Sequence, residues 1–162
     1  PANYRIGPNT RIVVQVVNFW LLTGGDSMCT KRLAIATLVG GIVMYAVGYL
    51  IWDIAFAEFF ASSGSDKVAR ETALIWPQIL GTFSLAALVT LGVGKGNQSS
   101  IVEGFKIGAT VGFLVWFGVD FIRYGIGDVL NLTATIVDPL LEIVRSGIGG
   151  AVIAAVLGRV EG

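Results

Sequence analysis

Two acidic residues, each followed three positions later by an arginine, lie in otherwise apolar stretches of the chain. Asp120 precedes Arg123 in GFKIGATVGFLVWFGVDFIRYGIGD, and Glu142 precedes Arg145 further along. Residues three apart are neighbours on a helix, so each acid can pair with the arginine of its own helix. Reciprocal pairs between the two stretches are also open if the stretches form antiparallel helices.

These charges lie among apolar residues, where an ionisable group costs roughly 2.5–3.5 kcal/mol at the centre of a bilayer. They must therefore be paired, hydrated or close to the membrane surface. Two interpretations are open. The charges form a salt-bridge network that fixes two helices, or they line a polar pocket for a cation, a metal ion or a small polar ligand. The candidate ligand-binding residues are Asp53, Asp120, Arg123, Asp138, Glu142 and Arg145.

The chain contains no histidine and one cysteine, Cys29. An intrachain disulfide is therefore impossible, and histidine-dependent metal sites and acid–base chemistry are excluded. No catalytic motif accompanies the carboxylates. We therefore expect no enzymatic activity, no cofactor and no metal site.

The composition is that of a membrane protein. Of the 162 residues, 54% are hydrophobic and only 14% are charged, whereas soluble domains carry about 25% charged residues. Long uncharged runs favour membrane spans. The net charge of zero gives no indication of nucleic-acid binding.

Four stretches can cross a bilayer, which requires about 20 largely apolar residues. The third and fourth reach that length only if they include the charged pairs. We predict helices over about 33–60, 72–94, 105–126 and 139–158. The predicted fold is an all-α, four-helix transmembrane bundle, with residues 28–162 as its single domain.

The distribution of basic residues predicts the orientation of the bundle. Cytoplasmic connections are enriched in lysine and arginine. With both termini in the cytoplasm, seven of the eleven basic residues lie on that side: Arg5, Arg11, Lys31, Arg32, Lys95, Lys106 and Arg159. We therefore expect both ends of the chain to be cytoplasmic and the charged pairs to lie near the outer face.

Small residues recur every four positions in three of the predicted helices. Such rows let helix backbones approach closely within lipid. They can pack the chain's own helices, a second copy, or a partner membrane protein. The helix-packing candidates are Gly40, Gly48, Gly104, Gly108, Gly112, Gly150, Ala154 and Gly158.

Residues 1–27 differ from the rest of the chain. Their apolar part, Ile12–Leu22, is too short to span a bilayer. The segment is an interfacial element, a tail or a non-native leader. The third interpretation arises because Gly24–Ser27 can be encoded by a purine-rich ribosome-binding sequence, which would make Met28 the natural start.

Three stretches, LAIATLVGGIVMYAVGYLIWDIAFAEFF, GFKIGATVGFLVWFGVDFIRY and LNLTATIVDPLLEIVRSGIGGAVIAAVL, resemble small uncharacterised bacterial inner-membrane proteins with four predicted helices. The resemblance covers about residues 29–158. It implies a multi-pass protein of the bacterial inner membrane and brings no catalytic residues with it.

Two functions follow from these features. The first is a non-enzymatic structural or accessory membrane subunit whose glycine rows hold helices together. The alternative is a small transporter or permeation protein, with its polar site formed by Asp120, Arg123, Glu142 and Arg145.

Overall fold

The computed structural model describes residues 27–64, 70, 72–95, 100–127 and 129–159, and no strand occurs within them. The interpretations of the segment before Ser27 therefore lie outside the described residues. The elements are α2 (Ser27–Gly48), the π-helix η1 (Tyr49–Ala55), α3 (Ala57–Ser62), α4 (Ile75–Lys95), α5 (Ile101–Ile126) and α6 (Leu132–Arg159).

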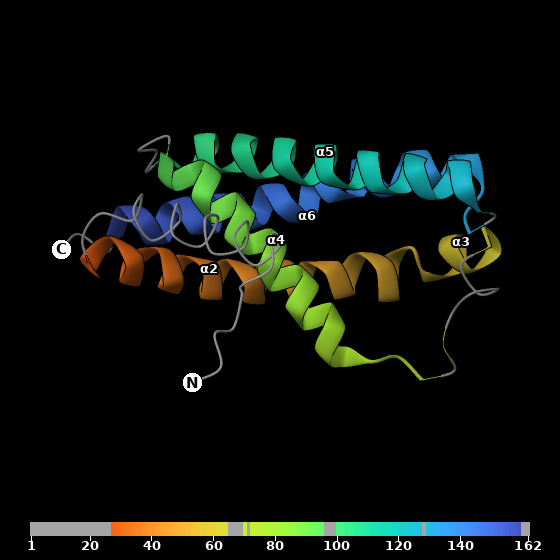
Figure 1. Ribbon diagram of the computed structural model, residues 1–162, viewed down its shortest axis with the longest axis horizontal. Helices are drawn as coiled ribbons and strands as arrows, with labels where there is room; N and C mark the ends of the chain where they lie inside the picture. The colour runs from red at the N-terminus through yellow and green to blue at the C-terminus, as the bar shows by residue number, and fades with distance from the viewer. Residues whose placement is uncertain (1–26, 65–69, 71, 96–99, 128, 160–162) are drawn as a thin grey trace, which may run out of the picture.

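Three of the long elements, α2 with η1, α5 and α6, run side by side along the length of the molecule (Figure 1). The fourth, α4, crosses them obliquely, so that its first turns diverge from the bundle. One end of the bundle carries α3 and the connection between α5 and α6, and we call it the α3 end. The other carries Lys31, Lys95 and Arg159, and we call it the basic end.

Four helices are long and apolar enough to cross a membrane: Lys31–Ala55, Ile75–Lys95, Ile101–Ile126 and Leu132–Arg159. Many of their large apolar side chains face outward, among them Leu38, Ile42, Leu80, Leu114 and Ile122. Soluble monomers rarely expose so much contiguous apolar surface, whereas a bilayer covers it. The predicted all-helical fold with four candidate spans is thus confirmed, and it is that of a multi-pass membrane protein.

The first helix is interrupted where the sequence predicts it to continue. It runs through η1 to Ala55, and Phe56 then leaves the helical region, with φ −118° and ψ 10°. The N–H of Phe56 donates to the carbonyl of Ile51 at 2.8 Å, a bond five residues long that is typical of a π-turn. No glycine or proline lies at this break. The apolar run from 33 to 60 therefore predicts one continuous helix.

The fourth helix begins at Leu132, seven residues before its predicted start at 139. Asn131 is its N-cap, because the side-chain oxygen accepts the N–H of Ala134 at 2.8 Å. Pro139 lies inside the helix rather than at its start. Membrane helices tolerate an internal proline. The earlier start places Asp138 inside α6, on the same helix as Glu142.

Glycines bring α5 and α6 into backbone contact. A methyl group on Gly104 would overlap Ala154, and one on Gly108 or Gly112 would overlap Ser146. As residue numbers increase along α5, the residue numbers that they contact on α6 decrease, so the two helices are antiparallel. This pair forms the most extensive helix contact among the described residues.

Small residues also join α2 to α6. A side chain at Gly40 would collide with Ile153, and one at Gly149 would collide with Met44. Gly48 lies against the side chain of Arg145 instead. Gly158 is half-buried near the basic end. The apolar core at that end comprises Ala36, Val89, Val93, Ile153, Ala154 and Leu157.

Candidate functional site: a buried acidic cluster

The antiparallel pairing of α5 and α6 brings two aspartates to the same level. Asp120 lies six residues before the end of α5, and Asp138 lies six residues after the start of α6. At 1.5 Å of rise per residue, both lie about 9 Å from the connection. Their charges are close enough to influence each other. Two ionised carboxylates at this level repel each other, and a hydrogen bond between them would require a proton on one, because ionised carboxylates only accept.

Asp120 is buried without a donor. The residue is 2% exposed, and no N–H or O–H group of the described residues donates to either of its carboxyl oxygens. Arg123 on the same helix comes no closer than 3.9 Å to Oδ1, and its own side chain is 47% exposed. This distance is too long for a hydrogen bond. The carboxyl group of Asp120 is therefore poorly compensated.

Asp138 connects α6 to the π-helix. The indole N–H of Trp52, in η1, donates to Oδ1 of Asp138 at 2.5 Å. The ring of Trp52 also contacts Arg145, whose guanidinium carbon lies 5.2 Å from the centre of the ring. Trp52 therefore contacts an acid through its N–H and a cation through its π-face.

Glu142 is the best compensated of the three acids. Nε of Arg145 lies 3.2 Å from its Oε2, and the hydroxyl of Ser146 donates to the same oxygen at 3.0 Å. The Arg145 side chain is only 11% exposed. Gly48 lets it lie across α2, because any side chain at that position would press on the arginine.

The charges of this region do not balance. Asp120, Asp138 and Glu142, which we call the acidic cluster, face one buried cation, Arg145, and one half-exposed cation, Arg123. The ion pairs form within each helix rather than reciprocally between helices. One carboxyl group is thus in excess. An unpaired carboxylate at this depth is costly, so the cluster is suited to take up a positive ion.

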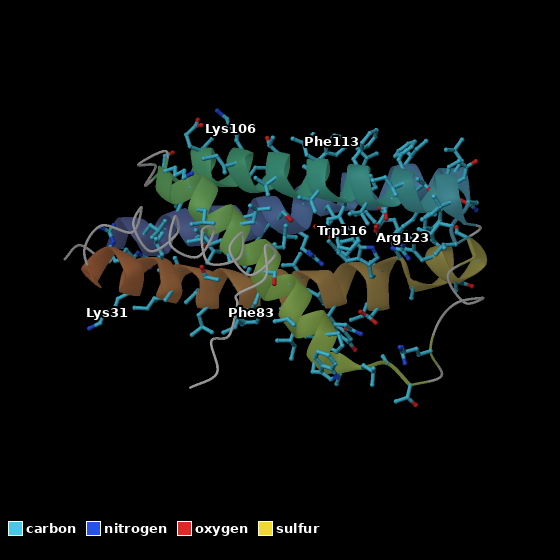
Figure 2. The ribbon with its side chains drawn as sticks, in the orientation of Figure 1. Lys31, Phe83, Lys106, Phe113, Trp116 and Arg123 are labelled. Atoms are coloured by element: carbon cyan, nitrogen blue, oxygen red, sulfur yellow. The ribbon has the colours of Figure 1, made fainter. Side chains whose placement is uncertain are left out.

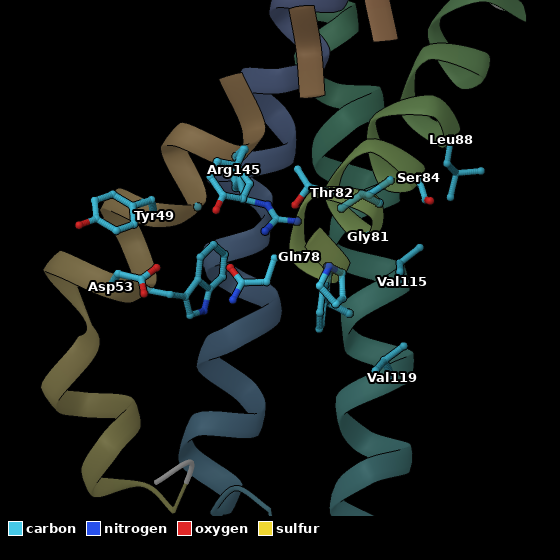
Figure 3. Close-up of a pocket in the computed structure, with 16 residues that line it drawn as sticks. Tyr49, Asp53, Gln78, Gly81, Thr82, Ser84, Leu88, Val115, Val119 and Arg145 are labelled. Carbon is cyan, nitrogen blue, oxygen red and sulfur yellow. The ribbon is translucent and has the colours of Figure 1, made fainter. Parts of the chain in front are cut away.

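Two pockets lie next to Arg145, and both are lined by Trp52, Asp53, Trp116 and Arg145. The end pocket, of about 500 Å³, is lined by Asp138 and Glu142 and by residues of α3. The lateral pocket, of about 600 Å³, lies between η1, α4 and α5. Arg145 projects into it toward α4 (Figure 3). Trp116 points from α5 into the bundle, whereas Lys106 and Phe113 point away (Figure 2).

The structure separates the predicted ligand-binding residues into two groups. Asp120, Asp138, Glu142 and Arg145 come together in the interior. Arg123 is half-exposed at the edge, and Asp53 lies on the exposed side of η1, where it lines both pockets. Trp52 was not among the residues predicted for the site. Its position in the row Ala36, Gly40, Met44, Gly48 and Trp52, which faces α6, was the signal that it reaches the site.

No group of three or more histidine, cysteine, aspartate or glutamate side chains arranged to hold a metal ion occurs in the described part of the chain. Comparison with protein-family models, with curated proteins and with solved structures finds no match to this chain. The resemblance to small bacterial membrane proteins therefore stays a prediction.

Proposed function

We propose that the chain is a small membrane transport protein that carries protons, with the acidic cluster as its proton-binding site. The observation that supports this proposal is the buried carboxyl group of Asp120, which accepts no hydrogen bond from any described donor and lies at the same level of the helix pair as Asp138. A proton shared by the two aspartates removes the excess charge and forms a bond between them.

Access to the cluster is one-sided, which favours a carrier over an open pore. The end pocket reaches Asp138 and Glu142 from the α3 end. Toward the basic end the helices close on the apolar core that contains Val89, Val93 and Ile153. A proton therefore passes only if the helices rearrange, and the rate is that of a conformational step.

The alternative role, an accessory subunit that binds a partner through its glycine rows, has less support. Gly104, Gly108 and Gly112 of α5 already face α6, and Gly40 already faces Ile153. These surfaces are covered by the chain's own helices and are not available to a partner.

We further propose that the α3 end faces outward and that both termini are cytoplasmic, in the inner membrane of a bacterium. The basic end carries Lys31, Arg32, Lys95 and Arg159, as cytoplasmic ends do. In intact cells a membrane-impermeant maleimide should label the exposed position Ser62→Cys but not Cys29. The opposite labelling would reverse the orientation.

Reconstitution into liposomes tests the transport function. Vesicles loaded with potassium and a pH-sensitive dye receive valinomycin, which sets an inside-negative potential. We expect faster acidification of the interior with the protein than in protein-free vesicles, without unitary channel currents in planar bilayers. Equal acidification with and without protein would contradict proton transport, and unitary currents would contradict a carrier.

A further inference from the structure

The lateral pocket exists because α4 diverges from the first helix. Toward the basic end α2 and α4 touch, since a side chain at Gly41 would press on the ring of Phe83. Beyond Phe83 the helices separate, and a methyl group at Gly81 would meet no atom within 4 Å. The resulting space of about 600 Å³ lies within the range of small-molecule sites, about 300–1,000 Å³.

Aromatic rings and one carboxylate dominate the chemistry of this pocket. Tyr45, Tyr49, Trp52 and Trp116 contribute to its walls, and aromatic faces attract cations. Asp53 lies on an exposed side of η1 and makes no ion pair with a described residue. The lining of the pocket thus combines four aromatic side chains with a carboxylate that has no ion pair among the described residues. Asp53 and Tyr49 lie on the same side of the pocket (Figure 3).

Arg145 also lines the lateral pocket, but its positive charge does not make the pocket selective for anions. Its guanidinium is already paired with Glu142 and stacked on Trp52. The acidic cluster behind it carries one carboxyl group more than the arginines of the site can balance, so the site has no excess of positive charge that would attract an anion. The stacking of Arg145 also demonstrates that a Trp52 face can hold a planar cation.

We propose that the lateral pocket binds a lipophilic organic cation, such as a quaternary ammonium or phosphonium ion. This inference rests on the proposed proton transport, since it assigns to the same protein an organic cation that is carried besides the proton of the acidic cluster. Asp53 supplies the countercharge and the aromatic rings supply the apolar and cation–π contacts. The divergence of α4 supplies the opening.

Equilibrium binding to the full-length chain in detergent tests this site without transport. The probe is radiolabelled tetraphenylphosphonium, and the matched control is tetraphenylborate, which has the same shape and the opposite charge. We expect saturable binding of the phosphonium and none of the borate. Equal binding of both ions, or no saturable binding of the phosphonium, would overturn the proposal.

Two glycines provide a matched pair of variants, because a methyl group at Gly81 or at Gly118 would meet no atom within 4 Å. Gly81 lines the lateral pocket and Gly118 does not. Gly81→Leu should weaken phosphonium binding by about tenfold, the equivalent of about 1.4 kcal/mol, whereas Gly118→Leu should leave it unchanged. Equal effects of the two variants would contradict a site in this pocket.

Asp53→Asn tests the countercharge and should also weaken phosphonium binding by about tenfold. Unchanged affinity in this variant would contradict the role of Asp53. The binding assay also separates the two proposals. Proton flux without phosphonium binding would overturn only the substrate assignment, whereas phosphonium binding without proton flux would overturn only the transport function.

Discussion

Asp120 on α5 and Asp138 on α6 lie at the same level of the antiparallel pair, each six residues from the helix end at which the two helices are joined. This relationship changes the meaning of the charged residues in the apolar stretches. In two acid–arginine pairs alone, the charge of each acid would be cancelled by that of its arginine. The third acid, Asp138, adds a negative charge that no further arginine of the site balances.

Replacement of Asp120 by asparagine distinguishes a functional acid from a structural one. Asp120→Asn removes a buried charge that accepts no hydrogen bond from a described donor, and it ends the repulsion with Asp138 at the same level of the helix pair. We expect the free energy of unfolding in detergent to rise by about 1 kcal/mol. A fall of similar size would indicate that the charge of Asp120 stabilises the bundle.

Arg145→Gln should have the opposite effect on stability. It leaves the buried carboxylate of Glu142 with only the hydroxyl of Ser146 as a partner. Removing one member of a buried ion pair costs about 3 kcal/mol. The double variant Arg145→Gln, Glu142→Gln should recover most of that loss in the same unfolding assay. A double variant no more stable than Arg145→Gln would contradict the pairing of these two residues.

Two tryptophans allow the hydrogen bond to Asp138 to be isolated. Trp52→Phe removes an indole N–H that donates to Asp138, whereas Trp116→Phe removes a buried N–H that has no acceptor among the described residues. Both lose ring volume, but only the first loses a hydrogen bond to an acid, which contributes about 2 kcal/mol. Trp52→Phe should therefore unfold more readily than Trp116→Phe. Equal losses would contradict the contact.

The close approach of α5 and α6 predicts unequal effects of two alanine substitutions. Gly108→Ala places a methyl group against the carbonyl oxygen of Ser146 and forces the helices apart. We expect a loss of about 2 kcal/mol in unfolding free energy, as for other overpacked sites. Gly118→Ala meets no atom and should change stability by less than about 0.5 kcal/mol. Comparable losses in both variants would contradict this helix interface.

Much of the architecture could be predicted from the sequence, because span length and residue spacing are local properties. Length alone required that the third and fourth helices include Asp120 and Glu142, and the three-residue spacing predicted the ion pairs with Arg123 and Arg145. The break at Phe56 was not predictable, since no glycine or proline marks it. The start of α6 at Leu132 depends on the cap formed by Asn131.

The composition of the site was less predictable, because it depends on how the helices rotate against each other. Successive residues on an α-helix differ by about 100° in direction. Trp52 therefore reaches Asp138 while Asp53, the next residue, lies on the exposed side. The packing of η1 against α6 decides whether Trp52 or Asp53 faces Asp138.

Proton uptake by variants in reconstituted vesicles tests the central claim most directly. Asp120→Asn removes the uncompensated acid, whereas the control Glu103→Gln alters a partly exposed acid on the same helix, paired with Lys106 at 2.7 Å. At equal amounts of folded protein, we predict that Asp120→Asn acidifies no faster than protein-free vesicles and that Glu103→Gln matches the wild type. Wild-type rates in the Asp120→Asn variant would contradict the proposal that the acidic cluster carries the proton.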